Sequence, residues 1–297
     1  MKRLVALVGF FLVAGCGAVG GPSTHTIALS YKKGDTYKYH YQATLNYTIG
    51  IQSMSIPVRV ELTADEKATV NSVDQNGTAD VTVDLSNTVV KTTANGTSNT
   101  TTTDKPTTLE VKIGPDGRIV SVNGEASNIS TGLPGIPGSQ GGLISAVLPD
   151  KPVKVGDTWV KSYDQTSPLG TGSIKVNSNN KYAKDEKVGS VNAAVVQSTI
   201  DTNINLNVDT AQAAQGGSTL FPGGSGTGLS GVAINGTDAS TVCSWIDTGA
   251  KRIVKTLQND TIDATLTFTS TPGSQPNPFL TGPLTLKGTQ ILDMTPA

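Results

Sequence analysis

The amino-acid sequence predicts an all-β protein whose long antiparallel strands form a curved sheet or half-barrel, with at most one or two short helices. Several stretches alternate strictly between apolar and polar residues, which is the pattern of strands with one buried face. The composition is rich in Thr, Ser, Asn and Gly and only 5% aromatic, a balance that favours strands and turns over helices. A single apolar face per strand is typical of antiparallel sheets, because parallel sheets are covered on both sides.

The clearest alternation covers residues 37–51, near the start of the predicted body. One parity holds the apolar and aromatic residues, which are Tyr37, Tyr39, Tyr41, Ala43, Leu45, Tyr47, Ile49 and Ile51. The other parity is polar for most of its length. Helical spacing would scatter these tyrosines around an axis, so the pattern predicts one long strand. Tyrosine combines apolar bulk with a polar tip, and these rings either fill a core or line a cavity.

Five further runs alternate in the same way, at residues 56–62, 79–85, 109–113, 200–209 and 262–268. Turn motifs separate the runs, namely Gln75-Asn76-Gly77, Pro115-Asp116-Gly117 and Asp247-Thr248-Gly249. Asn-Gly and Pro-Asp-Gly sequences are typical of the tight turns that join antiparallel strands. Pro57 lacks an N–H for the sheet ladder, so it predicts a sheet edge or a bulge at its position.

A few stretches lack this pattern. Residues 139–148 are the best helix candidate, although two glycines weaken it. Residues 131–142 and 216–231 are rich in Gly, Pro and Ser and are expected to be loops. The polar tract at residues 94–103 is expected to form either a hairpin tip or no fixed structure.

The body also resembles itself. Gly34-Asp35-Thr36 precedes a strand that opens with Tyr37, and Gly156-Asp157-Thr158 precedes one that opens with Trp159. We interpret this as a duplication with halves at about 27–130 and 150–297, joined by a Gly/Pro-rich linker. The alternative is that β-rich sequences share turn chemistry by chance. Duplicated halves would pair through one continuous sheet, since each alone has a thin core.

The first 16 residues have the three parts of an export signal. Lys2 and Arg3 provide a positive start, and Leu4–Leu12 is an apolar stretch interrupted only by Gly9. This stretch is too short to cross a bilayer, which requires about 20 residues. It ends in Val13-Ala14-Gly15-Cys16, which resembles the lipobox of bacterial lipoproteins. The alternatives are an ordinary signal peptide cleaved near Ala18 and a transmembrane helix.

The lipobox resemblance implies that the chain is cleaved before Cys16 and that Cys16 carries two or three acyl chains such as palmitate. Two acyl chains make membrane anchoring stable, whereas one chain is marginal. The expected location is therefore extracytoplasmic, on a bacterial membrane. In a Gram-negative host this is the outer membrane or cell surface, because Gly17 is not the Asp of many inner-membrane lipoproteins. Residues 17–26 are expected to form a flexible tether.

Two strand openings carry a wider resemblance. Lys33 to Tyr39, with Lys32 before them, follow the pattern K-x-G-D-x-Y-x-Y, and residues 152–159 read P-V-x-V-G-D-x-W. Chains with both openings resemble a family of uncharacterised bacterial lipoproteins and secreted proteins, which implies no activity. The predicted half-barrel is more loosely similar to periplasmic lipid-carrier lipoproteins, an analogy at the level of fold.

Chemically reactive residues are scarce. A formal net charge of −1 argues against a nucleic-acid partner, which requires a basic face. Two histidines, His25 in the expected tether and His40 on the polar parity, do not make a metal site by themselves. Cys243 has no partner for a disulfide once Cys16 is lipidated, and it is expected to be a small buried strand residue. We therefore predict no catalytic residue, no cofactor and no metal.

Two pairs of neighbouring carboxylates have the chemistry of acid–base catalysts, Asp65 with Glu66 and Asp185 with Glu186. The preferred interpretation is that they are solvated charges at turns. Asp35 and Asp157 are expected to cap their local turns, and structural sensitivity is expected there.

Three functional hypotheses follow. The leading one is a non-enzymatic envelope lipoprotein whose curved β body binds an apolar ligand or another envelope protein. The second is a structural or interaction module with no ligand, which requires a solid core. The third is a hydrolase whose site is assembled from ordinary Asp, Ser or Thr residues. An apolar cavity favours the first hypothesis, and a cleft that gathers carboxylates favours the third.

Overall fold

The computed structural model describes residues 24–103, 105–124, 146–165, 171–209, 229–271 and 282–297. The predicted signal with Cys16 and most of the predicted linker and loops lie outside these residues. The described residues contain strands and no helix. Among them, therefore, no helix is long and apolar enough to span a bilayer.

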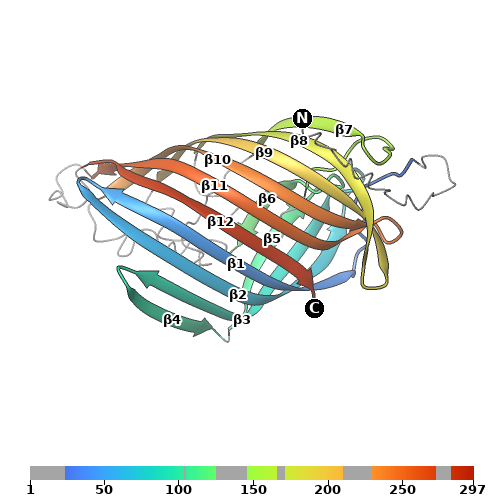
Figure 1. Cartoon of the computed structure of the whole chain (residues 1–297), viewed down its shortest axis with the longest axis horizontal. Coiled ribbons are helices and arrows are strands. Elements are labelled where there is room, and N and C mark those ends of the chain that lie inside the picture. Colours follow the sequence, from blue (N-terminus) through green and yellow to red (C-terminus); the bar gives the residue numbers. More distant parts are fainter. Residues whose placement is uncertain (1–23, 104, 125–145, 166–170, 210–228, 272–281) are drawn as a thin grey trace, which may run out of the picture.

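The strands confirm the predicted fold class. They are β1 (Thr36–Ile51), β2 (Met54–Val73), β3 (Ala79–Ala94), β4 (Thr97–Thr103), β5 (Thr107–Ile113), β6 (Ile119–Gly124), β7 (Thr158–Gln165), β8 (Thr171–Val188), β9 (Val191–Asp209), β10 (Leu229–Asp247), β11 (Arg252–Ser270) and β12 (Leu284–Pro296). All of them belong to one antiparallel sheet with the order β6-β5-β3-β2-β1-β12-β11-β10-β9-β8-β7, and β4 pairs separately with β3. Figure 1 shows that the sheet curls into a half-barrel.

The strand order places the first and last strands at the centre of the sheet. β1 pairs with β12 from Tyr39 opposite Pro296 to Ile51 opposite Leu284. Strands β1–β6 lie on one side of this pairing, and strands β7–β12 lie on the other. The ladder is antiparallel throughout, so neighbouring side chains on one face lie about 5 Å apart across strands. The two segments with similar sequence are therefore joined in one sheet.

The predicted alternation appears directly in the burial of β1. Tyr39, Tyr41, Ala43 and Leu45 are buried, while the residues between them are exposed or half-buried. We call the face that carries the buried side chains the inner face of the sheet and the opposite face the outer face. The same two-residue period recurs on β2, β3, β5, β8, β10 and β11.

Local turn chemistry explains two further predictions. Asn95 and Gly96 both have positive φ angles, 49° and 78°, as the two-residue turns of tight hairpins require. The polar tract at residues 94–103 is therefore a β3–β4 hairpin, the first of the two expected alternatives. Pro57 lies one residue outside the β2–β3 ladder, which begins at Val58, and it pairs with Thr48 in the β1–β2 ladder. The β2–β3 ladder therefore needs no N–H from Pro57.

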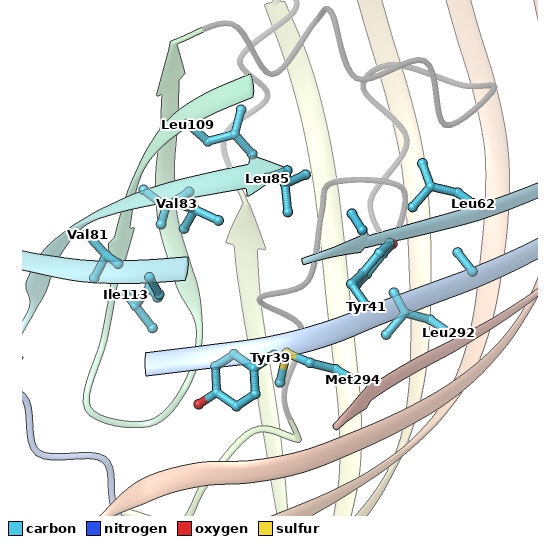
Figure 2. Packing of buried hydrophobic residues seen from close by; sticks show 14 of the residues in the cluster. Tyr39, Tyr41, Leu62, Val81, Val83, Leu85, Leu109, Ile113, Leu292 and Met294 are labelled. Atoms are coloured by element: carbon cyan, nitrogen blue, oxygen red, sulfur yellow. The ribbon is translucent and has the colours of Figure 1, made fainter. Parts of the chain in front are cut away.

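Three apolar clusters cover the inner face. Cluster A lies on β1, β2, β3, β5 and β12 and includes the side chains labelled in Figure 2. Cluster B lies on β8–β12 and consists of Ile174, Val176, Ile204, Leu206, Val208, Val232, Ile234, Ala264, Leu266 and Leu286. Cluster C combines inner-face residues with two irregular segments, and its members are Ile27, Leu29, Ala146, Leu148, Val153, Tyr182, Ala194, Val196, Val242 and Ile246.

The two irregular segments, residues 24–31 and 146–153, form a plug against one end of the inner face. His25 and Val153 exchange two backbone hydrogen bonds, of 2.7 and 2.9 Å. The plug also reaches strand-connecting turns, because the Leu29 N–H donates to the carbonyl oxygen of Pro115 at 2.8 Å. His25 thus belongs to the folded body and not to a free tether. Residues 146–148, the described end of the helix candidate, are not helical.

The two Gly-Asp-Thr turns have the same hydrogen bonds. The Gly34 N–H donates to Val70 O at 2.9 Å, and the Gly156 N–H donates to Tyr182 O at 2.8 Å. Each Asp accepts a backbone hydrogen bond from the residue three positions earlier, at 3.0 Å in both turns. Their carboxylates cap the local turn, as expected. The duplication itself stays a prediction.

Candidate ligand-binding face

The inner face of the sheet is mainly apolar, in contrast to the polar outer face. Its three clusters are built almost entirely from Val, Leu, Ile and Ala, with tyrosines near the plug. Such a surface suits an apolar ligand, and it equally suits a solid protein core. The polar groups on this face decide between the two, because a solid core leaves few buried polar atoms without a partner.

Polar side chains form a band across the inner face of β8–β11, interrupted on β9 by Ile200. We call this set the polar band; its members are Ser178, Asn180, Ser198, Thr202, Asp238, Ser240, Gln258 and Asp260, and all are buried. On β10 the band separates Ile234 of cluster B from Val242 of cluster C. On β11 it follows Ala264 of cluster B in the same way. The C-terminal half of the inner face is therefore apolar at both ends and polar in between.

The β8–β9 part of the band is internally satisfied. Asn180 donates through its amide nitrogen to the Ser178 hydroxyl at 3.0 Å, and it accepts from the Ser198 hydroxyl at 2.5 Å. The amide also donates to the backbone carbonyl of Trp159 at 3.2 Å. These residues are opposite or next to one another in the β8–β9 ladder. Fully paired groups of this kind are ordinary structural polar networks.

The β10–β11 part of the band holds two acids. Ser240 lies directly opposite Asp260 in the ladder, and its hydroxyl donates to Asp238 at 3.0 Å. The Gln258 amide nitrogen donates to Asp260 Oδ1 at 2.6 Å. Burial first, and then the nearby Asp260 carboxylate, raise the pKa of Asp238 to about 7, against the hydrogen bond from Ser240. Burial also raises the pKa of Asp260, to about 6, against the hydrogen bonds from Ser240 and Gln258.

Two acceptor atoms in this part have no hydrogen-bond partner. They are Oε1 of Gln258 and Oδ2 of Asp260, both fully inaccessible. Gln258 as a whole is 2% exposed. A buried polar atom without a partner costs about 1–3 kcal/mol, so these two oxygens mark a place where the protein alone is incomplete.

A third acid, Glu66, lies in cluster A on β2. Glu66 is 2% exposed, and both of its carboxyl oxygens lack a hydrogen-bond partner. It pairs in the ladders with Tyr39 on β1 and Leu85 on β3, both of which are buried core residues. Burial raises the pKa of Glu66 to about 8, so at neutral pH this side chain is mainly the uncharged acid.

The residues singled out from the sequence lie elsewhere. Cys16 is outside the described residues, so its lipidation stays a prediction. Cys243 is in a strand as expected, but it is only half-buried and lies on the outer parity of β10. The His40 side chain is 62% exposed and hydrogen-bonded to Asp65 at 2.7 Å, as its outer parity indicates. Among the described residues, no group of His, Cys, Asp and Glu could hold a metal.

The prediction that the two carboxylate pairs are solvated charges at turns is wrong about the turns for all four residues, and it is wrong about solvation for Glu66; the other three are half-buried or exposed. Asp65 and Glu66 lie in the middle of β2, and Asp185 and Glu186 lie in β8. Neighbouring strand residues point to opposite faces, so Asp65 reaches the outer surface while Glu66 is buried. Asp185 accepts a hydrogen bond from the Tyr182 hydroxyl at 2.5 Å.

Two described hollows bear on ligand size. One, of about 720 Å³, is lined by residues 149–153 and 156–161, which are close together in the chain and include the end of the plug. The other, between Tyr31, Tyr39 and Met294 near the plug, has a volume of about 20 Å³, which is room for about one water molecule. Neither hollow includes Glu66 or the polar band.

Comparisons with known proteins add little. No family model and no curated protein matches the chain. Among solved structures, a lipovitellin chain studied for its lipid–protein interactions aligns with a TM-score of 0.42 at 12% identity, over 90% of this chain and 26% of that one. This chain thus spans about a quarter of the lipovitellin chain. DynF from the dynemicin biosynthesis pathway of Micromonospora chersina aligns with a TM-score of 0.25 at 8% identity, over 98% and 92% of the two chains. Neither similarity carries a functional argument.

Proposed function

We propose that this protein is a non-enzymatic, lipid-anchored envelope protein that holds an amphiphilic molecule against the inner face of its half-barrel. The observation that carries the proposal is the position of Glu66. Both carboxyl oxygens are buried in the apolar cluster A, and neither has a hydrogen-bond partner. The ligand is mostly apolar, and it presents at least one polar atom to the inner face.

Free-energy arguments favour a ligand over a solid core at this position. A leucine would fill the same place without the cost of about 1–3 kcal/mol for an unpaired polar group. The residues that flank Glu66 on the inner face of β2 are Ala64 and Ala68, so its neighbours along the strand are small. Tyr39 and Leu85 lie beside it across the ladders. In its uncharged form the carboxyl group both donates and accepts one hydrogen bond. An alcohol, or an amide with an N–H, on an otherwise apolar ligand would satisfy both capacities.

The envelope location depends on the sequence of residues 1–16. Cys16→Ser removes the thiol to which lipid would be attached, and it should move the protein from the membrane fraction to the soluble fraction. The check is fractionation of cells that express either chain, followed by mass spectrometry of the mature amino terminus. A Cys16→Ser protein that stays in the membrane fraction would contradict the anchor.

Ligand binding is tested on residues 17–297, which include every described strand and all three clusters. The protein is purified without detergent and extracted with organic solvent, and the extract is analysed by mass spectrometry. We expect a co-purified amphiphile in stoichiometric amount. Glu66→Leu should reduce its recovery several-fold, because the variant offers no hydrogen bond to the ligand's polar atom.

The matched control is Glu110→Leu, the same chemical change at an exposed outer-face position on β5. It should leave recovery unchanged. Extracts without any amphiphile from several expression hosts would overturn the carrier proposal. Equal losses for both variants would assign the effect to general destabilisation and would also count against Glu66.

A second candidate function is an interaction module, and the β3–β4 hairpin favours it. All seven residues of β4 are exposed on both faces. β4 pairs with β3 on one side, and within the described residues its other edge has no strand partner. A strand with a free edge can accept an extended segment of another protein by β-augmentation. Deletion of residues 95–103 should leave lipid recovery intact under the first proposal and abolish partner binding under the second.

A further inference from the structure

The β10–β11 part of the polar band has a defined chemical character. Asp238 and Ser240 come from β10, and Gln258 and Asp260 come from β11; all four are buried on the inner face. Ser240 and Asp260 are direct cross-strand neighbours. The central members are linked by hydrogen bonds of 3.0 Å, from Ser240 to Asp238, and 2.6 Å, from Gln258 to Asp260.

Both atoms left without a partner in this group are hydrogen-bond acceptors. Gln258 uses its amide N–H on Asp260 Oδ1, which leaves Gln258 Oε1 and Asp260 Oδ2 unpaired. A buried donor is therefore missing, and two carboxylates that share one site favour a cationic donor. Across the neighbouring strands, Thr202 on β9 lies opposite Asp238, and Gln290 on β12 lies opposite Asp260. No described lysine or arginine forms an ion pair with either acid.

The apolar clusters on each side indicate where the rest of such a ligand lies. Cluster C is covered by the plug, because Ile27, Leu29 and Leu148 pack directly against its strand residues. Cluster B has no such segment among its members, which all come from strands β8–β12, and each member is at most 4% exposed. An aliphatic chain that extends from the acids to Ile234 on β10 and Leu266 on β11 would therefore replace the atoms that now bury these side chains.

We propose that Asp238, Ser240, Gln258 and Asp260 form the subsite for a protonated amine on the ligand, with the ligand's aliphatic part along cluster B. This inference rests on the proposed carrier function and names its ligand class, an amphiphile with a cationic amino head group. An ammonium group offers three N–H donors, enough for the two unpaired oxygens and one further acceptor of the acid pair. Glu66, which lies in cluster A, is outside this subsite.

The test compares two probes of equal chain length, decylamine and decanol, below their aggregation concentrations. Binding to residues 17–297, stripped of co-purified lipid, is measured by isothermal titration calorimetry at pH 8. Decylamine is cationic at this pH, since a primary amine has a pKa of about 10.4. We expect it to bind about tenfold to a hundredfold more tightly than decanol, as a buried hydrogen bond to a charged group implies.

Asp260→Asn should remove most of this preference and leave decanol binding nearly unchanged. Asp263→Asn is the matched control, because it is the same change on the same strand at an outer-face side chain that is 55% exposed, and it should keep the preference for decylamine. A measurement at pH 5 needs no substitution. Both aspartates are then mostly protonated, given pKa values of about 7 and about 6, so the preference should shrink in the unaltered protein.

The outcomes separate this inference from the carrier function. Decanol and decylamine that bind equally at pH 8 would overturn the amine subsite and leave the carrier function standing. Failure of both probes to bind would count against the carrier function itself. A preference for decylamine that persists in Asp260→Asn and at pH 5 would place the amine away from the acid pair and contradict the assignment.

Discussion

The two halves of the inner face differ in their polar chemistry although their turns are alike. In the N-terminal half, cluster A is apolar across β1, β2, β3 and β5, and it holds the isolated acid Glu66. In the C-terminal half, a band of eight polar residues divides clusters B and C. Both halves nevertheless begin with a Gly-Asp-Thr turn that has the same backbone hydrogen bonds.

This difference shows that the inner-face side chains can differ between the halves while the turns stay alike. Turn geometry is set by a few backbone constraints, so the turns at Gly34 and Gly156 remain superficially identical. Inner-face side chains are constrained by packing and by polar pairing alone. The C-terminal half satisfies most of its polar band internally and leaves two acceptors unpaired beside an acid pair. The N-terminal half leaves one whole carboxyl group unpaired in an apolar surrounding.

The largest expected effect concerns the isolated acid. The pKa of Glu66 is 4.5 in the unfolded chain and about 8 in the folded protein. Between these values the folded protein binds more protons, so its free energy of unfolding falls as pH rises, in total by up to about 5 kcal/mol at 1.36 kcal/mol per pKa unit. Glu66→Leu should remove this part of the slope when denaturant unfolding is compared at pH 5 and pH 8.

The slope that remains in Glu66→Leu belongs to Asp238 and Asp260, whose pKa values are also raised by burial. Asp238→Asn together with Asp260→Asn should flatten that part of the slope, which extends from about pH 4 to about pH 7. If Glu66→Leu left the pH dependence of the free energy of unfolding unchanged, Glu66 would be solvated in the folded protein. The N-terminal half would then hold no buried, unpaired acid to compare with the acid pair.

The second prediction tests whether clusters A and B are separate cores. Leu62→Ala in cluster A and Leu206→Ala in cluster B each remove a side chain that is 1% exposed. Each should lower the free energy of unfolding by about 2–5 kcal/mol. Because the clusters share only partly buried neighbours such as Tyr47, the double variant should be additive within about 0.5 kcal/mol. Chemical denaturation of the four chains measures the coupling.

The control for this cycle is Val160→Ala on β7. Its side chain is 67% exposed, so the change should stay within about 0.5 kcal/mol. A coupling energy well above the additive limit between Leu62 and Leu206 would show one core spread over both halves. The division of the inner face into clusters would then be wrong.

The third prediction concerns the satisfied part of the polar band. Asn180→Ala leaves the Ser178 and Ser198 hydroxyls without their shared partner, and it should cost about 1–3 kcal/mol. Asn177→Ala on the same strand removes an exposed hydrogen bond to Ser162 and should cost less than about 0.5 kcal/mol. Thermal unfolding of both variants at one pH measures the difference. Equal small losses would show that the band is hydrated and not a buried network.

Much of the fold was predictable from the sequence because a strand's period of two is a local property. The residues from Tyr37 to Leu45 alternate in the chain and alternate in burial. The pairing of β1 with β12 was not predictable, since it joins residues about 250 positions apart and leaves no local trace. The same holds for the docking of the plug: Ile27 and Leu29 alternate with more exposed residues in the chain, but that local pattern does not show which part of the sheet they pack against.

The candidate site was less accessible to sequence reasoning. Around Asp238, residues 235–241 are polar or small on both parities, so no pattern separates the inner face from the outer face. Glu66 had a usable signal, because it shares its parity with Leu62, Ala64, Ala68 and Val70. The acid pair on neighbouring strands depends on the β10–β11 register, which the sequence does not state.

The smallest expected effect tests the feature that the halves share. Gly34 has a φ angle of +90° and Gly156 has a φ angle of +97°, a region where a side chain costs roughly 1–2 kcal/mol. A Cβ at either position would meet no atom within 4 Å, so the cost is backbone strain without a steric contribution. Gly34→Ala and Gly156→Ala should therefore lower the free energy of unfolding by equal amounts, as measured by denaturant unfolding. Clearly unequal losses would show that the two turns have the same hydrogen bonds but different backbone strain. The two halves would then be alike in the hydrogen bonds of these turns and not in their energetics.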